Sequence, residues 1–263
     1  MLQRIADSII LCSTRDEIRV EHKTRRTLET ARGGVDLWVQ PIGDRKPDLY
    51  VLKFGGAGSR AERATMFPLD FWDDLAAEVW APNWPGFGKS DGRASVKGML
   101  EVGLQCYEEV RREANGQPIL VTGNSLGTAI ALAVAARHRD MAGLLLRNPP
   151  PLRQLIVGKH SWYSLWIGAW LIAQCVPREL DSISNARGSD VPALFVTSAK
   201  DRVVPIAYQD TVFNAYAGPK RQVLLPNADH ADFPAEEDLP NLRSQLQWLR
   251  QRAGFAAGTP ASA

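Results

Sequence analysis

The sequence predicts an α/β fold with a mainly parallel sheet, and three observations support this. Short aliphatic and β-branched runs alternate with segments of helical periodicity along most of the chain. One run, 119–122, leads into Gly123-Asn124-Ser125-Leu126-Gly127, and an alanine-rich segment of helical spacing follows at once. The 263 residues, 45% hydrophobic and 23% charged, suit one large globular domain, which we place at 1–263.

Composition excludes several classes of protein. A formal net charge of +2 does not suggest a nucleic-acid partner. The three cysteines are odd in number and far apart, so they predict neither a disulfide framework nor a metal site and favour a reducing compartment. Segment 1–12 lacks the sustained apolar core of a signal peptide. We therefore expect a cytoplasmic chain that uses no metal and no cofactor, and its oligomeric state stays open.

The elements expected before the serine motif follow from periodicity and turn residues. The first are a solvated approach segment or edge hairpin over 15–32 and a half-buried edge strand over 35–40. An interior strand over 49–54 then ends in the glycine loop 55–59. A short helix over 71–77, a strand over 78–84 that runs into the turn-rich stretch 85–92, and an amphipathic helix over 99–112 follow.

The rhythm of strands and helices resumes after the serine motif, with one interruption. We expect a strand over 141–147, an irregular insertion over 149–190, a strand over 191–198, a helix over 207–217, a strand over 222–225, a helix over 239–251, and a disordered tail over 253–263.

The insertion 149–190 contains a run without charged residues, from Ser161 to Pro177, in which three tryptophans recur at helical spacing. The run is shorter than the ~20 mostly apolar residues that a transmembrane helix needs. We interpret it as a helical lid over a pocket, with plain core packing an equal alternative and attachment to a membrane surface a lesser one. The candidate pocket residues are Trp84, Trp162, Trp166 and Trp170.

Ser125 is the candidate nucleophile. A serine on a sharp turn between strand and helix has a strained backbone and an exposed hydroxyl, and this needs small residues on both sides, such as Gly123 and Gly127. The amide of Leu126 would begin the helix, where a free N–H can stabilise an oxyanion. The bare pattern also occurs in ordinary turns, and the strand and helix around it favour the catalytic interpretation.

Asp201 and His230 each follow a predicted strand, as Ser125 does, so parallel βα units would bring all three to one sheet edge. A serine hydroxyl is a weak nucleophile until a base accepts its proton. His230 would be that base, and Asp201 would fix its tautomer and stabilise the imidazolium. We expect the other histidines to be surface or capping residues, and a salt bridge from Asp201 to its neighbours is the structural alternative.

The glycine loop allows two interpretations. The N–H of Gly56 could be the second oxyanion donor. Alternatively, Gly56 to Ala61 matches the pattern of a dinucleotide-binding turn, with Glu78 at the distance of the ribose-binding acid. We favour the first, because no clear helical periodicity follows Gly58.

From about Val35 to Arg252 the chain resembles the serine α/β-hydrolase superfamily, within it the short-lid esterase, thioesterase and peptidase-like branch. The resemblance rests on four motifs: Asn83–Ser90, Gly123–Gly127, Ala199–Pro205 and Asp229-His230. It implies a central, mainly parallel eight-stranded sheet, catalysis by Ser125, Asp201 and His230, and oxyanion donors at Leu126 and near Gly56. The family commonly has His-Gly before the second donor where this chain has Phe54-Gly55, so Ala57 is an alternative donor.

These observations predict a serine hydrolase that cleaves a small-molecule ester or thioester with an apolar acyl part through an acyl-enzyme on Ser125. An acyltransferase or a peptidase could use the same three residues. A small-ligand-binding protein without catalysis and a dinucleotide-dependent oxidoreductase are less favoured.

Overall fold

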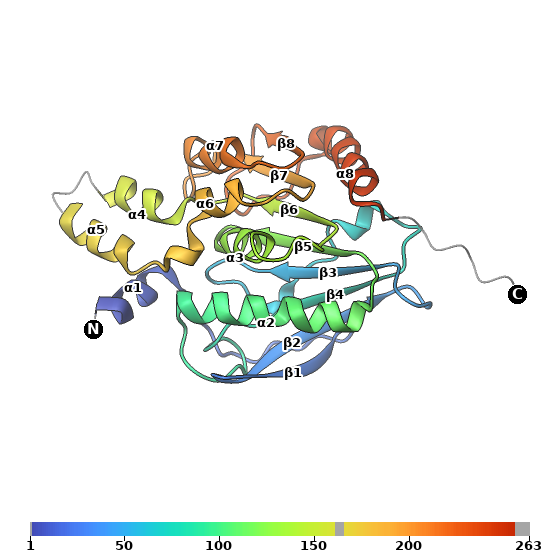
Figure 1. Ribbon diagram of the computed structural model, residues 1–263, viewed down its shortest axis with the longest axis horizontal. Coiled ribbons are helices and arrows are strands. Elements are labelled where there is room, and N and C mark those ends of the chain that lie inside the picture. Colours follow the sequence, from blue (N-terminus) through green and yellow to red (C-terminus); the bar gives the residue numbers. More distant parts are fainter. Residues whose placement is uncertain (1, 161–165, 256–263) are drawn as a thin grey trace, which may run out of the picture.

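The computed structural model describes residues 2–160 and 166–255, and a sheet of eight strands forms its centre (Figure 1). The strands are β1 (Thr24–Thr30), β2 (Gly33–Ile42), β3 (Leu49–Phe54), β4 (Ala77–Pro82), β5 (Ile119–Asn124), β6 (Gly143–Arg147), β7 (Ala193–Ser198) and β8 (Lys220–Leu225). Their order across the sheet is β1-β2-β4-β3-β5-β6-β7-β8. Only the β1–β2 and β2–β4 pairs are antiparallel among them. The carboxyl ends of β3 to β8 therefore share one edge.

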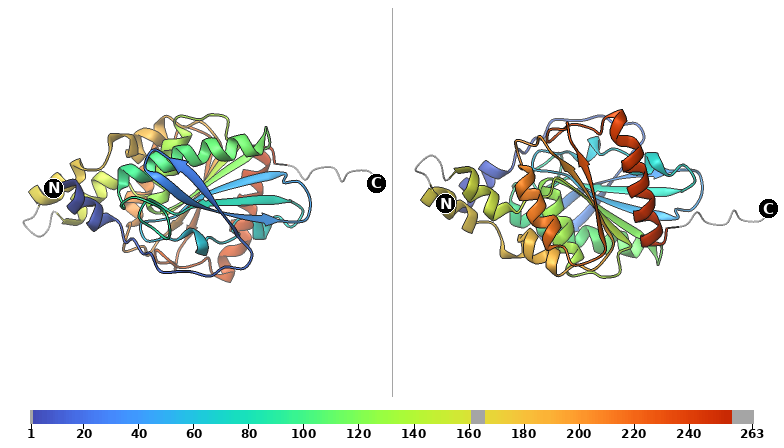
Figure 2. Two further views of the ribbon diagram at one scale, coloured as in Figure 1. Left: turned by 90° about the horizontal axis from the view of Figure 1, so that it is seen from below. Right: turned by 90° about the horizontal axis from the view of Figure 1, so that it is seen from above.

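The helices cover both faces of the sheet (Figure 2). They are α1 (Leu2–Ile10), α2 (Val96–Ala114), α3 (Leu126–Ala135), α4 (Leu152–His160), α5 (Trp166–Gln174), α6 (Ser182–Arg187), α7 (Ile206–Ala215) and α8 (Leu239–Ala253). Buried side chains of α2, α3 and α7 belong to one hydrophobic core, and those of α8 belong to a second core. The sheet thus has an α3 side and an α8 side.

Sequence accounts for the elements that carry the site. Strand β5 is buried up to its last residue, as its apolar run predicts. Every residue of α3 is buried, which its alanine-rich composition permits because small side chains let it lie close to the sheet. Helix α2 begins where the Ser95 side chain accepts the N–H of Gly98 and ends at Asn115 in the left-handed region.

Two expectations about the first third of the chain are wrong. The predicted helix over 71–77 is not formed: the chain makes a single 3-10 turn, Leu69–Phe71, and a further turn at 73–74 leads into β4. The apolar residues Leu69, Trp72 and Leu75 recur every third position, and short turns bury them against the second core as well as a helix would. The strand predicted at the sheet edge is β2, which lies inside the sheet because the chain forms the hairpin β1–β2.

In the described part of the insertion 149–190 the chain forms the α-helices α4, α5 and α6, and α5 lies within the run 161–177 that lacks charged residues. Helix α5 packs against α4 and α1 at one end of the molecule (Figure 1). Trp162 lies outside the described residues, as do residues 256–263 of the expected tail. Phe255 is buried, with its ring 5.5 Å from that of Trp72. Over 2–160 and 166–255, no helix has both the length and the hydropathy that crossing a bilayer requires.

Candidate active site

Ser125 occupies the sharp turn between β5 and α3, with φ 52° and ψ −124°. A non-glycine residue rarely adopts a positive φ, and such strain at a turn is typical of functional sites. Hydrogen bonds hold the strained residue in place: its N–H donates to the carbonyl of Arg147 (2.9 Å), and its carbonyl accepts the N–H (2.9 Å) and the hydroxyl (2.6 Å) of Thr128.

The two glycines of the motif are needed for space. A Cβ on Gly127 would lie 2.0 Å from the Phe54 carbonyl oxygen, and a Cβ on Gly123 would lie 2.6 Å from the Cα of Thr128. Both distances are far below contact distance. The close approach of Gly127 to Phe54 brings the turn at Ser125 against the loop that follows β3.

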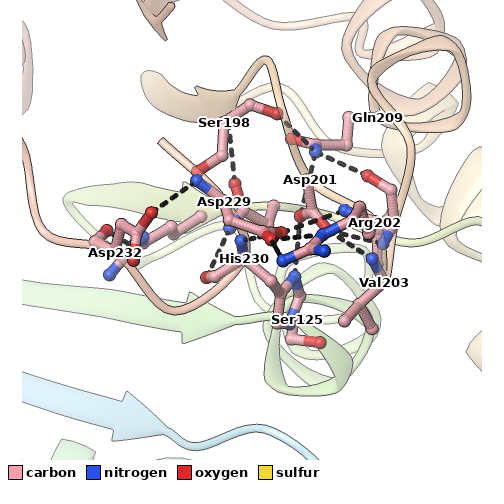
Figure 3. Close-up of polar contacts among 12 residues, drawn as sticks. Ser125, Ser198, Asp201, Arg202, Val203, Gln209, Asp229, His230 and Asp232 are labelled. Atoms are coloured by element: carbon pink, nitrogen blue, oxygen red, sulfur yellow. Dashed lines mark hydrogen bonds and ion pairs between the residues drawn. The ribbon is translucent and has the colours of Figure 1, made fainter. Parts of the chain in front are cut away.

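Asp201 and His230 meet as the sequence predicts. The distance from His230 Nδ1 to Asp201 Oδ2 is 2.7 Å, and the side chains are 19% and 0% exposed. The other carboxylate oxygen of Asp201 accepts the N–H groups of Val203 (2.8 Å) and Val204 (2.7 Å). A carboxylate with this many donors accepts the N–H of an imidazole in one fixed orientation. Figure 3 shows His230 lying between Asp201 and Ser125.

Two polar residues outside the predicted set support this pair. The buried Gln209 on α7 donates from Nε2 to Asp201 Oδ2 (3.2 Å) and to the Val204 carbonyl (2.7 Å). Asp229 accepts the backbone N–H groups of His230 (2.7 Å) and Arg202 (3.0 Å) and forms an ion pair with Arg202 (2.6 Å). These bonds, first the two backbone donors, lower the pKa of Asp229 to about 2. Asp229 thus ties the His230 loop to the Asp201 loop.

Asn148, directly after β6, also connects the His230 loop to the end of β7, where the Asp201 loop begins. It is fully buried with φ 51°. Its side chain donates from Nδ2 to the His230 carbonyl (3.0 Å) and accepts the Ser198 N–H (3.0 Å) at Oδ1. One side chain therefore fixes the end of β7 and the backbone of His230.

Two loops contribute backbone amides near Ser125. Leu126 is the first residue of α3, so its N–H has no acceptor within the helix. In the other loop, the N–H of Gly56 donates to Ser59 Oγ (2.9 Å). The amino-terminal segment 11–16 holds this loop from outside: Cys12 donates its N–H to the Ala57 carbonyl (3.0 Å), and Arg60 Nη1 donates to the Thr14 carbonyl (3.1 Å).

A cavity of about 420 Å³ adjoins these loops. Its walls include Gly55, Asn124 and Ala231, the immediate chain neighbours of Gly56, Ser125 and His230. Lys53 and Arg147 also line it, from the side of the sheet where β3, β5 and β6 carry residues of the second core. Burial lowers the pKa of Lys53 to about 7 and also lowers the pKa of Arg147.

Comparison with known proteins agrees with this architecture. Residues 55–170 match the family described as alpha/beta hydrolase fold. The chain resembles an esterase of Pyrococcus furiosus in structure, with a TM-score of 0.68 at 13% identity over 93% of this chain and 98% of that one. The chain has the α/β-hydrolase fold.

Several bacterial proteins are similar to this chain in sequence. A protein of Mycobacterium tuberculosis is 28% identical over 181 residues, which are 68% of this chain and 61% of that protein. The YfhR protein of Escherichia coli K12 is 26% identical over 231 residues, 82% of this chain and 77% of YfhR. The match thus spans less than two thirds of the mycobacterial protein.

Of the four candidate pocket tryptophans, Trp84 and Trp170 have described side chains, and neither lines the cavity. Trp84 is 1% exposed, with its ring 5.7 Å from that of Phe54. Trp170 on α5 is 48% exposed. Trp166 belongs to α5, and Trp162 lies outside the described residues. The cavity is instead lined by residues at the carboxyl ends of β3, β4, β5 and β6, by residues of the segment 55–67, and by Ala231 and Phe233 after β8. In the sequence, only their position next to the motifs pointed to some of these residues.

The dinucleotide interpretation finds no support in the glycine loop. Residues 55–60 form a loop that leads into a 3-10 turn, Ala61–Arg63, whereas a dinucleotide fingerprint opens an α-helix. Glu78 accepts the indole N–H of Trp80 (2.7 Å) from within β4. Among the described residues, no group of three His, Cys, Asp or Glu side chains is arranged to hold a metal ion.

Proposed function

We propose that this chain is a serine hydrolase that cleaves a carboxylic ester or thioester through an acyl-enzyme on Ser125. The observation that carries the proposal is the 2.7 Å bond between His230 and Asp201 beside a serine held in a strained turn. Buried Asp201 orients His230 so that its Nε2 is free to act on the serine hydroxyl. The fold likeness to an esterase agrees with this chemistry, although fold alone does not establish activity.

In the first half of the reaction, Ser125 Oγ attacks the carbonyl carbon while His230 Nε2 accepts the hydroxyl proton. The carbonyl oxygen becomes an oxyanion, which the N–H of Leu126 stabilises. His230 then gives the proton to the departing alcohol or thiol, leaving the acyl group on Ser125. In the second half, a water molecule attacks the acyl-enzyme with His230 again as base, and Ser125 regains its proton.

The second oxyanion donor comes from the loop after β3. The N–H of Gly56 is bonded to Ser59 Oγ, so Gly56 can serve only if the oxyanion displaces that hydroxyl. Ala57 is the alternative donor. The hydrogen bond from the Cys12 N–H to the Ala57 carbonyl helps to fix the backbone of this residue. In either case Ser59 lies close to the reacting group, because it bonds the amide beside Ser125.

The test is labelling with a fluorophosphonate together with turnover of 4-nitrophenyl esters of increasing acyl length. We expect the wild type to label and to turn over short or medium esters. Ser125→Ala should abolish labelling and lower kcat by a factor of about 10⁴ or more. Ser184→Ala, an exposed serine on α6, is the matched control and should behave as wild type. A folded wild type that neither labels nor hydrolyses any ester would refute the proposal.

A further inference from the structure

The cavity beside Ser125 has an unusual distribution of charge. Four cationic side chains line it, Lys53, Arg60, Arg63 and Arg147, and no acidic side chain is among the described residues of its wall. Arg60 is neutralised by the buried Glu62 behind the wall, at 2.5 Å. The other three have no ion pair with a carboxylate among the described residues. A cavity of this kind holds a positive potential that low-dielectric walls strengthen.

The unpaired cations are held in place by neutral groups. Lys53 Nζ donates to the carbonyls of Thr65 (2.9 Å) and Phe67. Arg147 donates from Nη2 to the Asp232 carbonyl, and its Nε is buried without a hydrogen-bond partner. A buried donor without a partner is costly unless a ligand satisfies it. Asn124 contributes a second unpartnered buried atom, Oδ1, to the same wall.

Carboxylates outside the wall do not cancel this charge. The charge of Asp70 raises the pKa of Lys53 by less than burial lowers it. Asp201 and Asp232 act on Arg147 in the same way. Asp201 already accepts four hydrogen bonds, including that of His230, and Asp232 Oδ2 accepts the N–H of Asp229. An anion that entered the cavity would therefore supply these cations with a negative charge that no side chain of the described wall provides.

We propose that this cavity binds an anionic group of the substrate, a carboxylate or a phosphate, while the ester carbonyl reacts at Ser125. The inference rests on the proposed serine hydrolysis and adds the substrate class. Asn124 and Ala231 line the cavity and are the chain neighbours of Ser125 and His230. A substrate whose anionic group lies a few bonds from its ester would therefore reach from Ser125 into the cavity. The volume of about 420 Å³ accommodates a short acyl chain with a terminal carboxylate.

The kinetic test compares two esters of equal acyl length, mono-4-nitrophenyl adipate and 4-nitrophenyl hexanoate, each corrected for its rate without enzyme. The wild type should have the higher kcat/KM for the adipate. Lys53→Met should lower the adipate-to-hexanoate ratio about tenfold, as expected for loss of one charge-assisted contact. Arg63→Gln, at an exposed position, should lower the ratio in a protein whose folding is not at risk. Arg252→Gln, an exposed arginine on α8, is the control that should leave it unchanged.

A binding experiment separates failure of this inference from failure of the proposed function. Adipate itself, titrated calorimetrically into Ser125→Ala protein, should bind, and the further change Lys53→Met should weaken binding about tenfold. Hexanoate turnover that depends on Ser125, without preference for the adipate ester and without adipate binding, overturns the anion site only. Adipate binding that depends on Lys53, in a protein that hydrolyses neither ester, keeps the anion site and overturns the proposed hydrolysis.

Discussion

Gln209 Nε2 lies 3.2 Å from Asp201 Oδ2, the same carboxylate oxygen that bonds to His230. This second donor draws negative charge away from the bond with the imidazole. Gln209 also bonds to the Val204 carbonyl, so it fixes the backbone of the loop that contains Asp201. Gln209 is therefore a positioning residue that acts through Asp201.

Gln209→Met should lower kcat about tenfold with little change in KM, because the substrate does not touch this residue. It should also move the acidic limb of the kcat/KM profile to higher pH, since a carboxylate with fewer donors stabilises the imidazolium more strongly. Gln222→Met, which removes a glutamine bonded to Thr197 and Asp210, is the matched control. An unshifted pH profile would mean that Gln209 has only a structural role.

Asn148 offers a separate test of how the His230 loop is held. Both Asn148→Gly and Asn148→Ala lose the bonds to His230 and Ser198, so both should lower kcat about tenfold. The alanine variant should be less stable than the glycine variant by about 1 kcal/mol, because only glycine tolerates the positive φ without strain. Asn115→Gly, at an exposed residue with φ 45°, should be close to neutral. Equal activity of wild type and both variants would contradict the positioning role.

Gly127→Ala should be among the most damaging single-methyl changes in the chain. Its Cβ would overlap the Phe54 carbonyl, so either the turn at Ser125 or the loop after β3 must move. We expect a loss of about 3 kcal/mol or more in the free energy of unfolding, measured by urea denaturation. Gly168→Ala in α5 has open space around the added methyl group and should stabilise or leave stability unchanged. Similar stabilities for the two variants would show that the overlap is relieved cheaply.

The pKa of Lys53 predicts a pH-dependent stability. Burial, opposed by Asp70 and assisted by Lys23, lowers this pKa from 10.5 to about 7 in the folded chain. Between these values the unfolded chain binds the extra proton, so Lys53 destabilises the fold most below pH 7, and stability rises as pH approaches 10.5. Lys53→Met should therefore stabilise the protein most at or below pH 7, and its advantage should shrink above pH 7. Urea denaturation of both proteins at pH 6, 8 and 9.5 measures this, and a constant difference would contradict the shift.

The sequence predicted the parallel strands and the contact between Asp201 and His230 because both depend on local patterns. An apolar run followed by turn residues indicates where a strand ends, and strands β5, β7 and β8 end directly before the three candidate residues or a few positions earlier. Parallel topology then brings those ends together without any knowledge of packing. The superfamily resemblance added the number of strands, which the structure confirms.

What the sequence could not predict depends on contacts between distant residues. Gln209 and Asn148 are ordinary polar residues until folding places them at 3.2 Å from Asp201 and 3.0 Å from the His230 carbonyl. The cationic cavity likewise combines Lys53 with Arg147 from different strands. The prediction of a helix over 71–77 was wrong because a three-residue repeat of apolar side chains fits 3-10 turns as well as a helix. The roles of Ser125, Leu126 and Gly56 stay predictions that the labelling and kinetic experiments test.

The attachment of segment 11–16 to the loop after β3 has a consequence for how the molecule forms during synthesis. Residues 11–16 are synthesised before their partners at Ala57, Arg60 and Gly88. His230 is synthesised later still. The candidate site is thus assembled from segments that lie far apart in the sequence, and no fragment that lacks segment 11–16 or His230 contains it complete.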